Sequence, residues 1–344
     1  MKRHQQFLFP FLIPLSWIYG IVIFLRNKLY DLGWIKGAII NKPIISIGNI
    51  TSGGTGKTPM VIYMSQLLQK KGKKPGIISR GYGRKSQGLQ VVHDGTKLIA
   101  EVNVAGDEPY LMAKMLENVP IVVSENRING IKKLIDNYLV DIIIMDDGFQ
   151  HMKVKRDLDI VTVSANEKEN NYRLLPWGNL REPIKNIKRA NLVIYTKTNN
   201  HILPDIHPFI FRHLRSKHLT SILKPVLMKY KNSSYKKITT PTEPMFAFCG
   251  IADPLSFRSS AEELSLQIKC CQFFKDHQDY NASVIKKLSD EISLNKITSV
   301  VTTEKDVVKL PTSFLSEFDI YIIKINFKFG NDVAFLSELE SAMI

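Results

Sequence analysis

The sequence predicts an α/β fold: a mostly parallel sheet with helices on both faces, followed by a second, smaller α/β domain joined by a hinge. Short β-branched runs alternate with helix-like stretches over roughly the first two hundred of the 344 residues, a pattern typical of parallel sheets. From Lys217 to about Pro244 the sequence becomes polar and rich in Thr, Ser and Lys. A second set of apolar runs follows this stretch, so we expect a hinge there.

The order of the runs gives the expected elements. The first domain is expected to hold strands at Pro43–Ile47, Pro75–Ser79, Pro120–Val123, Asp141–Met145, Leu158–Val163 and Asn191–Thr196, with helices at Pro59–Lys71, Glu108–Leu116 and Ile128–Tyr138. A strand at Ile222–Tyr230 is expected in the hinge, and strands near Met245–Cys249, Ile297–Thr302 and Tyr321–Ile325 in the smaller domain. The last helix-like run, Asp332–Met343, could pack on either domain. The expected domains are therefore an apolar segment at 1–28, a core at 29–218, a hinge at 219–243 and a C-terminal domain at 244–344.

Composition restricts the possible partners. The net charge of +15 and the pI near 9.5 favour anionic partners such as a nucleotide, a phosphorylated substrate or an acidic membrane face. Lysines are scattered and no nucleic-acid motif accompanies them, so nucleic acid is not an expected partner. The three cysteines lack Cys-x-x-Cys spacing, which predicts neither a disulfide framework nor a zinc site and fits a reducing cytosol. No obligate protein partner is evident.

The N-terminus is apolar and flanked by basic residues. Gln5–Leu25 carries no charge, and Arg26 and Lys28 follow it. Such a stretch could just span a bilayer, lie in its interface or pack on the protein's own core, and Pro10 and Pro14 would bend or break the helix. No small-residue cleavage site follows, which disfavours a signal peptide. We expect the segment to rest on the inner leaflet of a membrane.

The stretch Ile44–Pro59, IISIGNITSGGTGKTP, is a β-branched run followed by a glycine-rich turn and Gly-Lys-Thr. Such a turn presents backbone N–H groups to phosphate, while the lysine reaches the outer phosphates and the threonine hydroxyl can bind Mg²⁺. The expected nucleotide contacts are Thr51, Ser52, Gly53, Gly54, Thr55, Gly56, Lys57 and Thr58. Thr51 replaces the usual first glycine, a variant that resembles the MinD/dethiobiotin-synthetase branch of P-loop proteins. Ser52 stands where the dimer-forming ATPases of that branch have a second lysine. The fold expected is thus of the P-loop NTPase type.

Acidic residues follow another strand, in Val140–His151, VDIIIMDDGFQH. The strand beside a phosphate loop commonly ends in a carboxylate that holds Mg²⁺, which makes Asp146 and Asp147 candidate ligands. Because side chains alternate along a strand, both can face one way only if the strand has ended before Gly148. The alternative is a pair of solvated loop carboxylates.

Five further motifs carry charged residues. In SRGYGR, Arg80 and Arg84 lie on a glycine-rich turn and suit phosphate contact, although solvated arginines are the competing interpretation. In GDEP, Asp107 could simply cap a helix. LPWGNLREP carries Arg181 and Glu182, FKDHQDY carries a lone His277 that could be structural, and TTEKD ends a strand of the second domain.

Taken together, GNITSGGTGKTP, SRGYGR, GDEP, DDGFQH, LPWGNLREP, KDHQDY and TTEKD, in this order, resemble the tetraacyldisaccharide 4'-kinase family of lipid A biosynthesis. The resemblance runs from about Pro43 to Asp306. It implies transfer of the γ-phosphate of ATP, with Mg²⁺, to the 4'-hydroxyl of a lipid A disaccharide 1-phosphate. It also implies work at the cytoplasmic face of the bacterial inner membrane.

The resemblance assigns roles to two of the ambiguous residues. It implies Asp107 as the general base and His277 as its partner, completing the site when the second domain closes. Two positions depart from the family's usual form: Gln278 stands where a second histidine is common, and Lys275 where proline is common. The Mg²⁺ ligands remain open among Thr58, Asp146, Asp147 and Glu182. A MinD/ParA-like membrane-associated ATPase switch is the alternative function, and a ligase or another small-molecule kinase of the same branch is a third.

Overall fold

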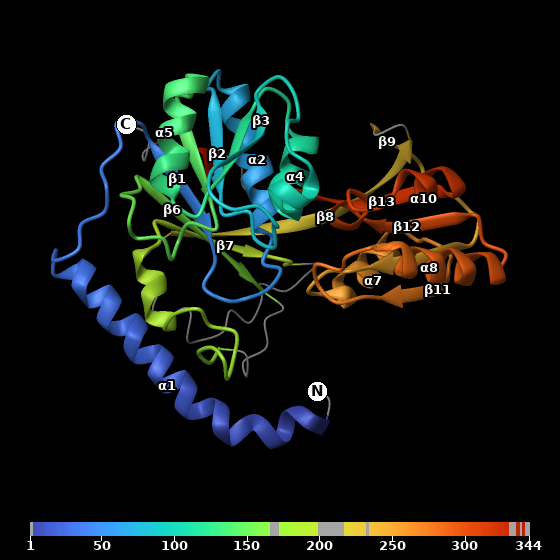
Figure 1. The fold of residues 1–344 in the computed structure, drawn as a ribbon, viewed down its shortest axis with the longest axis horizontal. Coiled ribbons are helices and arrows are strands. Elements are labelled where there is room, and N and C mark those ends of the chain that lie inside the picture. The colour runs from blue at the N-terminus through green and yellow to red at the C-terminus, as the bar shows by residue number, and fades with distance from the viewer. Residues whose placement is uncertain are drawn as a thin grey trace. The chain divides into compact units, whose positions relative to one another are not determined.

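The structure is a computed structural model that describes residues 3–165, 172–198, 217–231, 234–329, 335–337 and 339–340. It divides into two compact units (Figure 1). Unit 1 comprises Met1–Arg80, Asn126–Leu223 and Phe327–Ile344, and unit 2 comprises Gly81–Glu125 and Lys224–Asn326. These units group Gly81–Glu125 with the C-terminal half of the chain, whereas the sequence places it in the core domain. The domain boundaries expected from the sequence stay a prediction.

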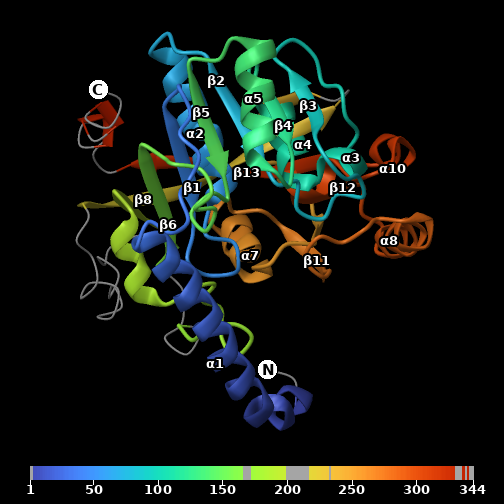
Figure 2. The same cartoon turned by 60° about the vertical axis from the view of Figure 1, so that its left-hand side comes forward.

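Unit 1 contains a parallel sheet. Its strands are β1 (Ile44–Gly48), β2 (Pro75–Ser79), β5 (Ile142–Asp146), β6 (Leu158–Ser164), β7 (Leu192–Thr196) and the start of β8 (Lys217–Lys231). They lie in the order β8-β7-β6-β1-β5-β2, and every neighbouring pair is parallel. Helices α2 (Lys57–Lys70) and α5 (Arg127–Tyr138) run beside these strands in Figure 2, and a 3-10 helix, η2 (Ile184–Arg189), precedes β7. The expected βαβ alternation is therefore confirmed in this unit.

The order of the strands decides where the site is. β1 lies between β5 and β6, with Ile47 beside Asp146 on one side and beside Ile160 on the other. The carboxyl ends of these parallel strands therefore meet at one edge of the sheet, where ligands bind in open α/β sheets. β1, β2, β5 and β7 are buried along their whole length, because apolar β-branched residues fill both faces of each strand.

Unit 2 also contains strands and helices in alternation. Its strands are β3 (Gln90–Asp94), β4 (Pro120–Val123), β9 (Ser234–Lys237), β10 (Met245–Cys249), β11 (Ile268–Phe273), β12 (Ser299–Thr303) and β13 (Asp319–Phe329). Its helices are α3 (Val102–Ala105), α4 (Asp107–Met115), α7 (Pro254–Glu263), α8 (Ala282–Leu294), α9 (Glu304–Val307) and α10 (Thr312–Glu317). β11, β10, β12 and β13 are parallel in that order, while β3–β4 and β8–β9 are antiparallel pairs.

The expected hinge contains long regular structure. The 15-residue strand β8 starts in unit 1 and continues into unit 2, and β9 folds back on it. β8 and β9 together cover 217–231 and 234–237 of this polar stretch. β3, β9 and β11 were not expected from the sequence, because short edge strands such as β11 have weak hydrophobic patterns.

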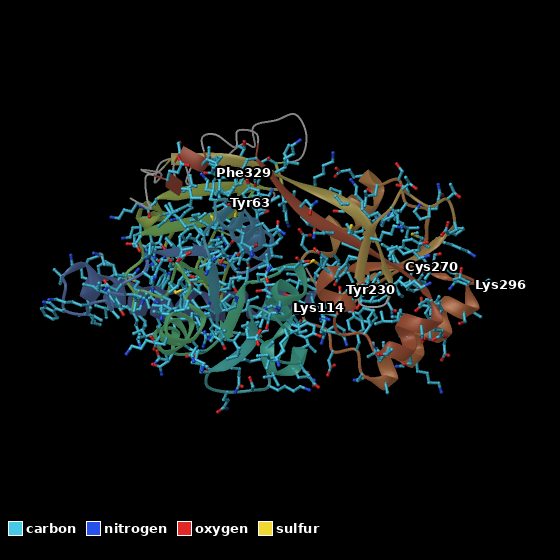
Figure 3. The ribbon with its side chains drawn as sticks, turned by 90° about the horizontal axis from the view of Figure 1, so that it is seen from above. Tyr63, Lys114, Tyr230, Cys270, Lys296 and Phe329 are labelled. Carbon is cyan, nitrogen blue, oxygen red and sulfur yellow. The ribbon has the colours of Figure 1, made fainter. Side chains whose placement is uncertain are left out.

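Aromatic residues tie the C-terminal segment to unit 1. Tyr63 of α2 contacts Phe327, Phe329 and Phe335, and Phe329 stacks on Phe335 with ring centroids 4.5 Å apart. Tyr63 and Phe329 lie together in Figure 3. Of the expected terminal helix, 335–337 and 339–340 are helical, and its other residues lie outside the described part of the chain.

The N-terminal apolar segment forms one helix, α1 (Arg3–Asp31). The helix runs unbroken through Pro10 and Pro14, and Figure 1 shows that it curves along its length. A proline within a helix removes a backbone hydrogen bond and favours such bending. In the described part of the chain, its Leu12–Asp31 stretch is the only helix whose length and composition would suffice to cross a membrane.

Candidate active site

The glycine-rich turn lies between β1 and α2, as the sequence predicts. α2 begins at Lys57, directly after Gly56, whose φ of +84° is in the left-handed region that favours glycine. Lys57 and Thr58 thus occupy the first helical turn, where backbone N–H groups have no partner within the helix. Ser52, Gly53 and Gly54 are at least partly exposed, so the turn offers its backbone to a phosphate.

Side chains on two buried strands anchor this turn. The Thr55 hydroxyl lies 2.9 Å from the Thr162 hydroxyl of β6 and accepts a hydrogen bond from Asn49. The Thr196 hydroxyl of β7 donates to the Thr55 carbonyl at 2.9 Å. Neither Thr162 nor Thr196 was expected from the sequence to be part of the site. Their signal was a hydroxyl on an otherwise apolar buried strand, because such a group requires a partner.

The variant positions of the turn are also anchored. Thr51 is buried and pairs as a β-bridge with Leu180, and the Ser52 N–H donates to the Asn179 carbonyl at 2.7 Å. The Ser52 hydroxyl is 3.2 Å from the same carbonyl. The backbone of Thr51 and Ser52 therefore attaches the turn to the LPWGNLREP loop.

Asp146 and Asp147 have different surroundings. Asp146 is the last residue of β5, is buried and accepts a 2.7 Å hydrogen bond from Ser79 at the end of β2. Asp147 has a φ of +51°, so the strand has ended there, as expected. Its carboxylate lies 3.5 Å from Lys57 and 2.8 Å from Arg181. Burial alone would raise the pKa of Asp147, but Lys57 and Arg181 outweigh it and lower that pKa.

Glu182 is engaged within the protein. It is fully buried, and its carboxylate accepts hydrogen bonds from Gln150, Asn186 and Arg189 at 2.8–3.0 Å. Both oxygens are used by these donors, so this carboxylate fixes the loop before β7. Because these donors occupy both of its oxygens, Glu182 serves as a structural carboxylate here and not as an open metal ligand.

The two arginines of SRGYGR differ as well. Arg80 is exposed at the end of unit 1, which leaves it accessible to an anion. Arg84 belongs to unit 2, its side chain is only 3% exposed, and its guanidinium binds the Gly88 carbonyl and Glu125. Arg84 thus stabilises its own loop, and these contacts argue against a role in nucleotide binding.

Asp107 and His277 meet within unit 2. Asp107 begins α4, and His277 follows β11 with a φ of +57°. The Nδ1 atom of His277 lies 3.0 Å from Oδ2 of Asp107, and the Tyr82 ring packs beside the imidazole with centroids 5.3 Å apart. The two side chains are 16% and 27% exposed, so the pair is reachable by a substrate. Both belong to the same unit, although the sequence places them in different domains.

The pair is electrostatically coupled. The hydrogen bond to Asp107 raises the pKa of His277 and outweighs burial, which lowers it. Burial raises the pKa of Asp107, but His277 and Lys309 together hold it below its ordinary value. Lys309 was not expected from the sequence to be part of the site, and its Nζ is 3.2 Å from Oδ2 of Asp107. Nearby, Lys305 of TTEKD pairs with Glu108.

Three features define the class of protein as a P-loop phosphotransferase. They are the phosphate-binding turn followed by Lys-Thr, the carboxylate at the end of the adjacent strand, and the aspartate paired with a histidine. The model of the tetraacyldisaccharide-1-P 4'-kinase family matches residues 8–343. Curated relatives named tetraacyldisaccharide 4'-kinase include proteins of Chlorobaculum parvum, 37% identical over 89% of this chain and 84% of the relative, and Desulfotalea psychrophila, 35% identical over 93% and 92%.

A solved structure is also similar. The crystal structure of the enzyme from Aquifex aeolicus in complex with ATP aligns with a TM-score of 0.78 and 31% sequence identity, and covers 96% of this chain and 98% of that one. The chain belongs to the tetraacyldisaccharide-1-P 4'-kinase family, whose members act in lipid A biosynthesis. Its resemblance to this family is confirmed, and the ATPase switch is not favoured.

Proposed function

We propose that this chain transfers the γ-phosphate of ATP to the 4'-hydroxyl of a tetraacyldisaccharide 1-phosphate, with Asp107 as the general base and His277 as its partner. The observation that carries these residue roles is the 3.0 Å contact between His277 and Asp107. A sugar hydroxyl is a weak nucleophile until an acceptor takes its proton. When its Nδ1 is protonated, His277 donates a hydrogen bond to Oδ2 of Asp107. This fixes the orientation of the carboxylate that accepts the proton of the sugar hydroxyl.

The nucleotide is assigned to unit 1. The turn from Thr51 to Gly56 would hold the phosphates by its backbone N–H groups, and Lys57 would pair with the β- and γ-phosphates. Lys57 is only 3.5 Å from Asp147 in this structure, so a bound phosphate would compete with that carboxylate for the ammonium group. Exposed Arg80 is the further candidate for an anion contact.

Magnesium fits the oxygen donors at this edge of the sheet. Asp146 ends the strand paired with β1, and Thr58 is in the first turn of the helix that follows the phosphate turn. The described residues contain no group of three His, Cys, Asp or Glu side chains able to hold a metal, so phosphate and water would supply the other ligands. Asp146 and Thr58 would hold the ion, which when bound neutralises phosphate charge.

The pairing can be tested by titrating His277. Asp107 raises the pKa of His277 and burial lowers it. Asp107→Asn is therefore expected to lower the pKa of His277 from its wild-type value toward, or below, the ordinary value of a histidine. NMR of the ring protons over a pH series, assigned with His277→Gln, measures the shift. His151 of unit 1 is the internal control, because burial lowers its pKa to about 4 and this should not change. An unchanged His277 pKa would contradict the pairing.

The membrane surface is assigned to α1. Ser16, Gly20, Ile23 and Asn27 recur on one face of the helix, and Ser16 donates to the Leu174 carbonyl at 3.0 Å. Tyr19 donates to the Arg181 carbonyl from the same side. Seven large apolar residues of the helix are instead more than half exposed: Leu15, Trp17, Ile18, Ile21, Val22, Phe24 and Leu25. A face of this kind suits insertion into the headgroup boundary, and the basic surplus suits anionic lipid on the cytoplasmic side.

Two charges on this face should release the protein from membranes. Trp17 and Ile21 are 69% and 58% exposed, so Trp17→Glu/Ile21→Glu should leave the fold intact. Since each buried apolar side chain contributes about 1.5–3 kcal/mol, binding to phosphatidylglycerol–phosphatidylethanolamine vesicles should weaken by at least about tenfold. Leu294→Glu, at a residue 82% exposed in unit 2, is the matched control. Equal sedimentation of the double variant and the control with vesicles would show that α1 is not the anchor.

A further inference from the structure

A lysine and a buried carboxylate lie behind the Asp107–His277 pair in unit 2. Lys309 follows α9, and its side chain is 10% exposed. Its Nζ atom is 3.2 Å from Oδ2 of Asp107 and 3.7 Å from Oδ1 of Asp306. It also lies 5.5 Å from the centre of the Tyr280 ring. The ammonium group is therefore held between two carboxylates and one aromatic face.

Asp306 is a fixed point for this lysine. It is fully buried, and its carboxylate accepts hydrogen bonds from the Thr303 hydroxyl, the Tyr280 hydroxyl and the Gly250 N–H at 2.6, 2.9 and 3.0 Å. Three donors from different parts of the chain leave this group little freedom to rotate. The position of Lys309 follows from that of Asp306.

The same carboxylate also supports the backbone of His277. Gly250 donates to Asp306, and the Gly250 carbonyl accepts a hydrogen bond from the His277 N–H at 3.2 Å. A Cβ atom at position 250 would lie 2.8 Å from the Cβ of Gln278 and 3.1 Å from Oδ1 of Asp306, so this close approach requires glycine. Asp306 thus fixes both groups that contact Asp107: Lys309 directly and His277 through Gly250.

We propose that Lys309, held by Asp306, is a positioning residue for the general base: it binds Oδ2 of Asp107 together with His277, directs Oδ1 to the acceptor hydroxyl and keeps the carboxylate ionised. This inference rests on the proposed role of Asp107. Among the described residues, both contacts of this carboxylate go to Oδ2. Two donors on one oxygen leave the other to take the proton.

The charge around Asp107 gives the sign of the effect. Burial raises the pKa of Asp107, and hydrogen bonding and charge from His277 and Lys309 reverse this. Further charged or titratable groups lie around these three residues: Tyr82, Asp276 and Lys305 near His277, Glu108 paired with Lys305, and Asp306 and Tyr280 against Lys309. Without the lysine the effect of burial is less opposed, so the pKa of Asp107 rises and the base is protonated over a wider range of acidic pH.

The test is the pH profile of kcat/KM for Lys309→Met in the full chain, with ATP, Mg²⁺ and tetraacyldisaccharide 1-phosphate in detergent micelles. The midpoint of the acid limb should move up by about one pH unit or more, since an opposite charge at this distance shifts a carboxyl by that amount. Lys309→Arg keeps the charge and should restore a midpoint close to that of the wild type. A loss of folded enzyme that is the same at every pH does not move the midpoint, and circular dichroism over the same pH range shows whether the variant stays folded along the acid limb.

Lys229→Met is the matched control. Lys229 also pairs with a carboxylate, Asp319 at 2.7 Å, and lies 5.4 Å from the centre of the Tyr321 ring. Its removal should leave the profile of the wild type. A Lys309→Met profile with an unshifted midpoint would overturn the proposal, whether or not activity is lower. Full activity in Asp107→Asn would instead overturn the role of Asp107, so the two failures can be told apart.

Discussion

Asp107→Asn is expected to lower kcat for phosphorylation of the tetraacyldisaccharide 1-phosphate by about 10²- to 10⁴-fold, the usual contribution of a positioned general base. The asparagine side chain keeps the size of the carboxylate and can remain near His277 and Lys309, but it cannot accept a proton from the 4'-hydroxyl. ATP affinity should stay unchanged, since the turn from Thr51 to Gly56 and Lys57, and not Asp107, is proposed to hold the phosphates. Steady-state kinetics and equilibrium binding of ATP measure the two effects.

The matched control is Asp94→Asn, in the same unit. Asp94 is the last residue of β3, and its carboxylate accepts hydrogen bonds from Thr96 and Lys97, which lower its pKa to about 2. This variant should keep the kcat of the wild type. If Asp107→Asn retained more than about a tenth of the wild-type kcat, a positioned base at this residue would be ruled out.

Glu182→Ala is expected to destabilise unit 1 by about 3–5 kcal/mol, because it removes one partner of a buried ion pair and leaves the other charge without compensation. Arg189 is the partner that loses its carboxylate, while Gln150 and Asn186 lose their acceptor. The loss should appear in the free energy of unfolding of the protein without nucleotide or metal, measured in urea.

An exposed pair provides the comparison. Lys71 and Glu340 form an ion pair in which the glutamate is 56% exposed, so Glu340→Ala should cost less than about 1 kcal/mol. The predicted loss of stability in Glu182→Ala distinguishes a structural carboxylate from one that served as a metal ligand. Removal of a carboxylate that only bound the metal would leave the metal-free protein as stable as the wild type and would weaken only the binding of Mg²⁺.

Local sequence was enough to predict the phosphate turn and the end of β5. Each is a short segment whose pattern contains both the element and the functional group, as in the Gly56–Thr58 stretch and in Asp146 at the end of its strand. The parallel pairing of β1 with β5 then brings these segments to one edge of the sheet. The pairing of Asp107 with His277 came from the resemblance, since no local pattern connects residues 170 positions apart.

The parts that the sequence did not predict depend on contacts between distant segments. Lys309 is one of many scattered lysines, and only the fold brings it to Asp107. Glu182 has a carboxylate that could bind a metal, but the folded loop brings three hydrogen-bond donors to it. Arg84 was expected from its residue type and its glycine-rich turn to bind phosphate, but its guanidinium contacts the Gly88 carbonyl and Glu125 instead.

The central claim is that this chain phosphorylates the 4'-hydroxyl of a lipid A disaccharide. The most direct measurement is a reaction of the purified full chain with γ-labelled ATP, Mg²⁺ and tetraacyldisaccharide 1-phosphate in micelles, with the product analysed by phosphorus NMR. We expect label in the lipid and a second phosphomonoester at the 4' position, both missing with Asp107→Asn. Consumption of ATP by the wild type without labelled lipid would contradict the account.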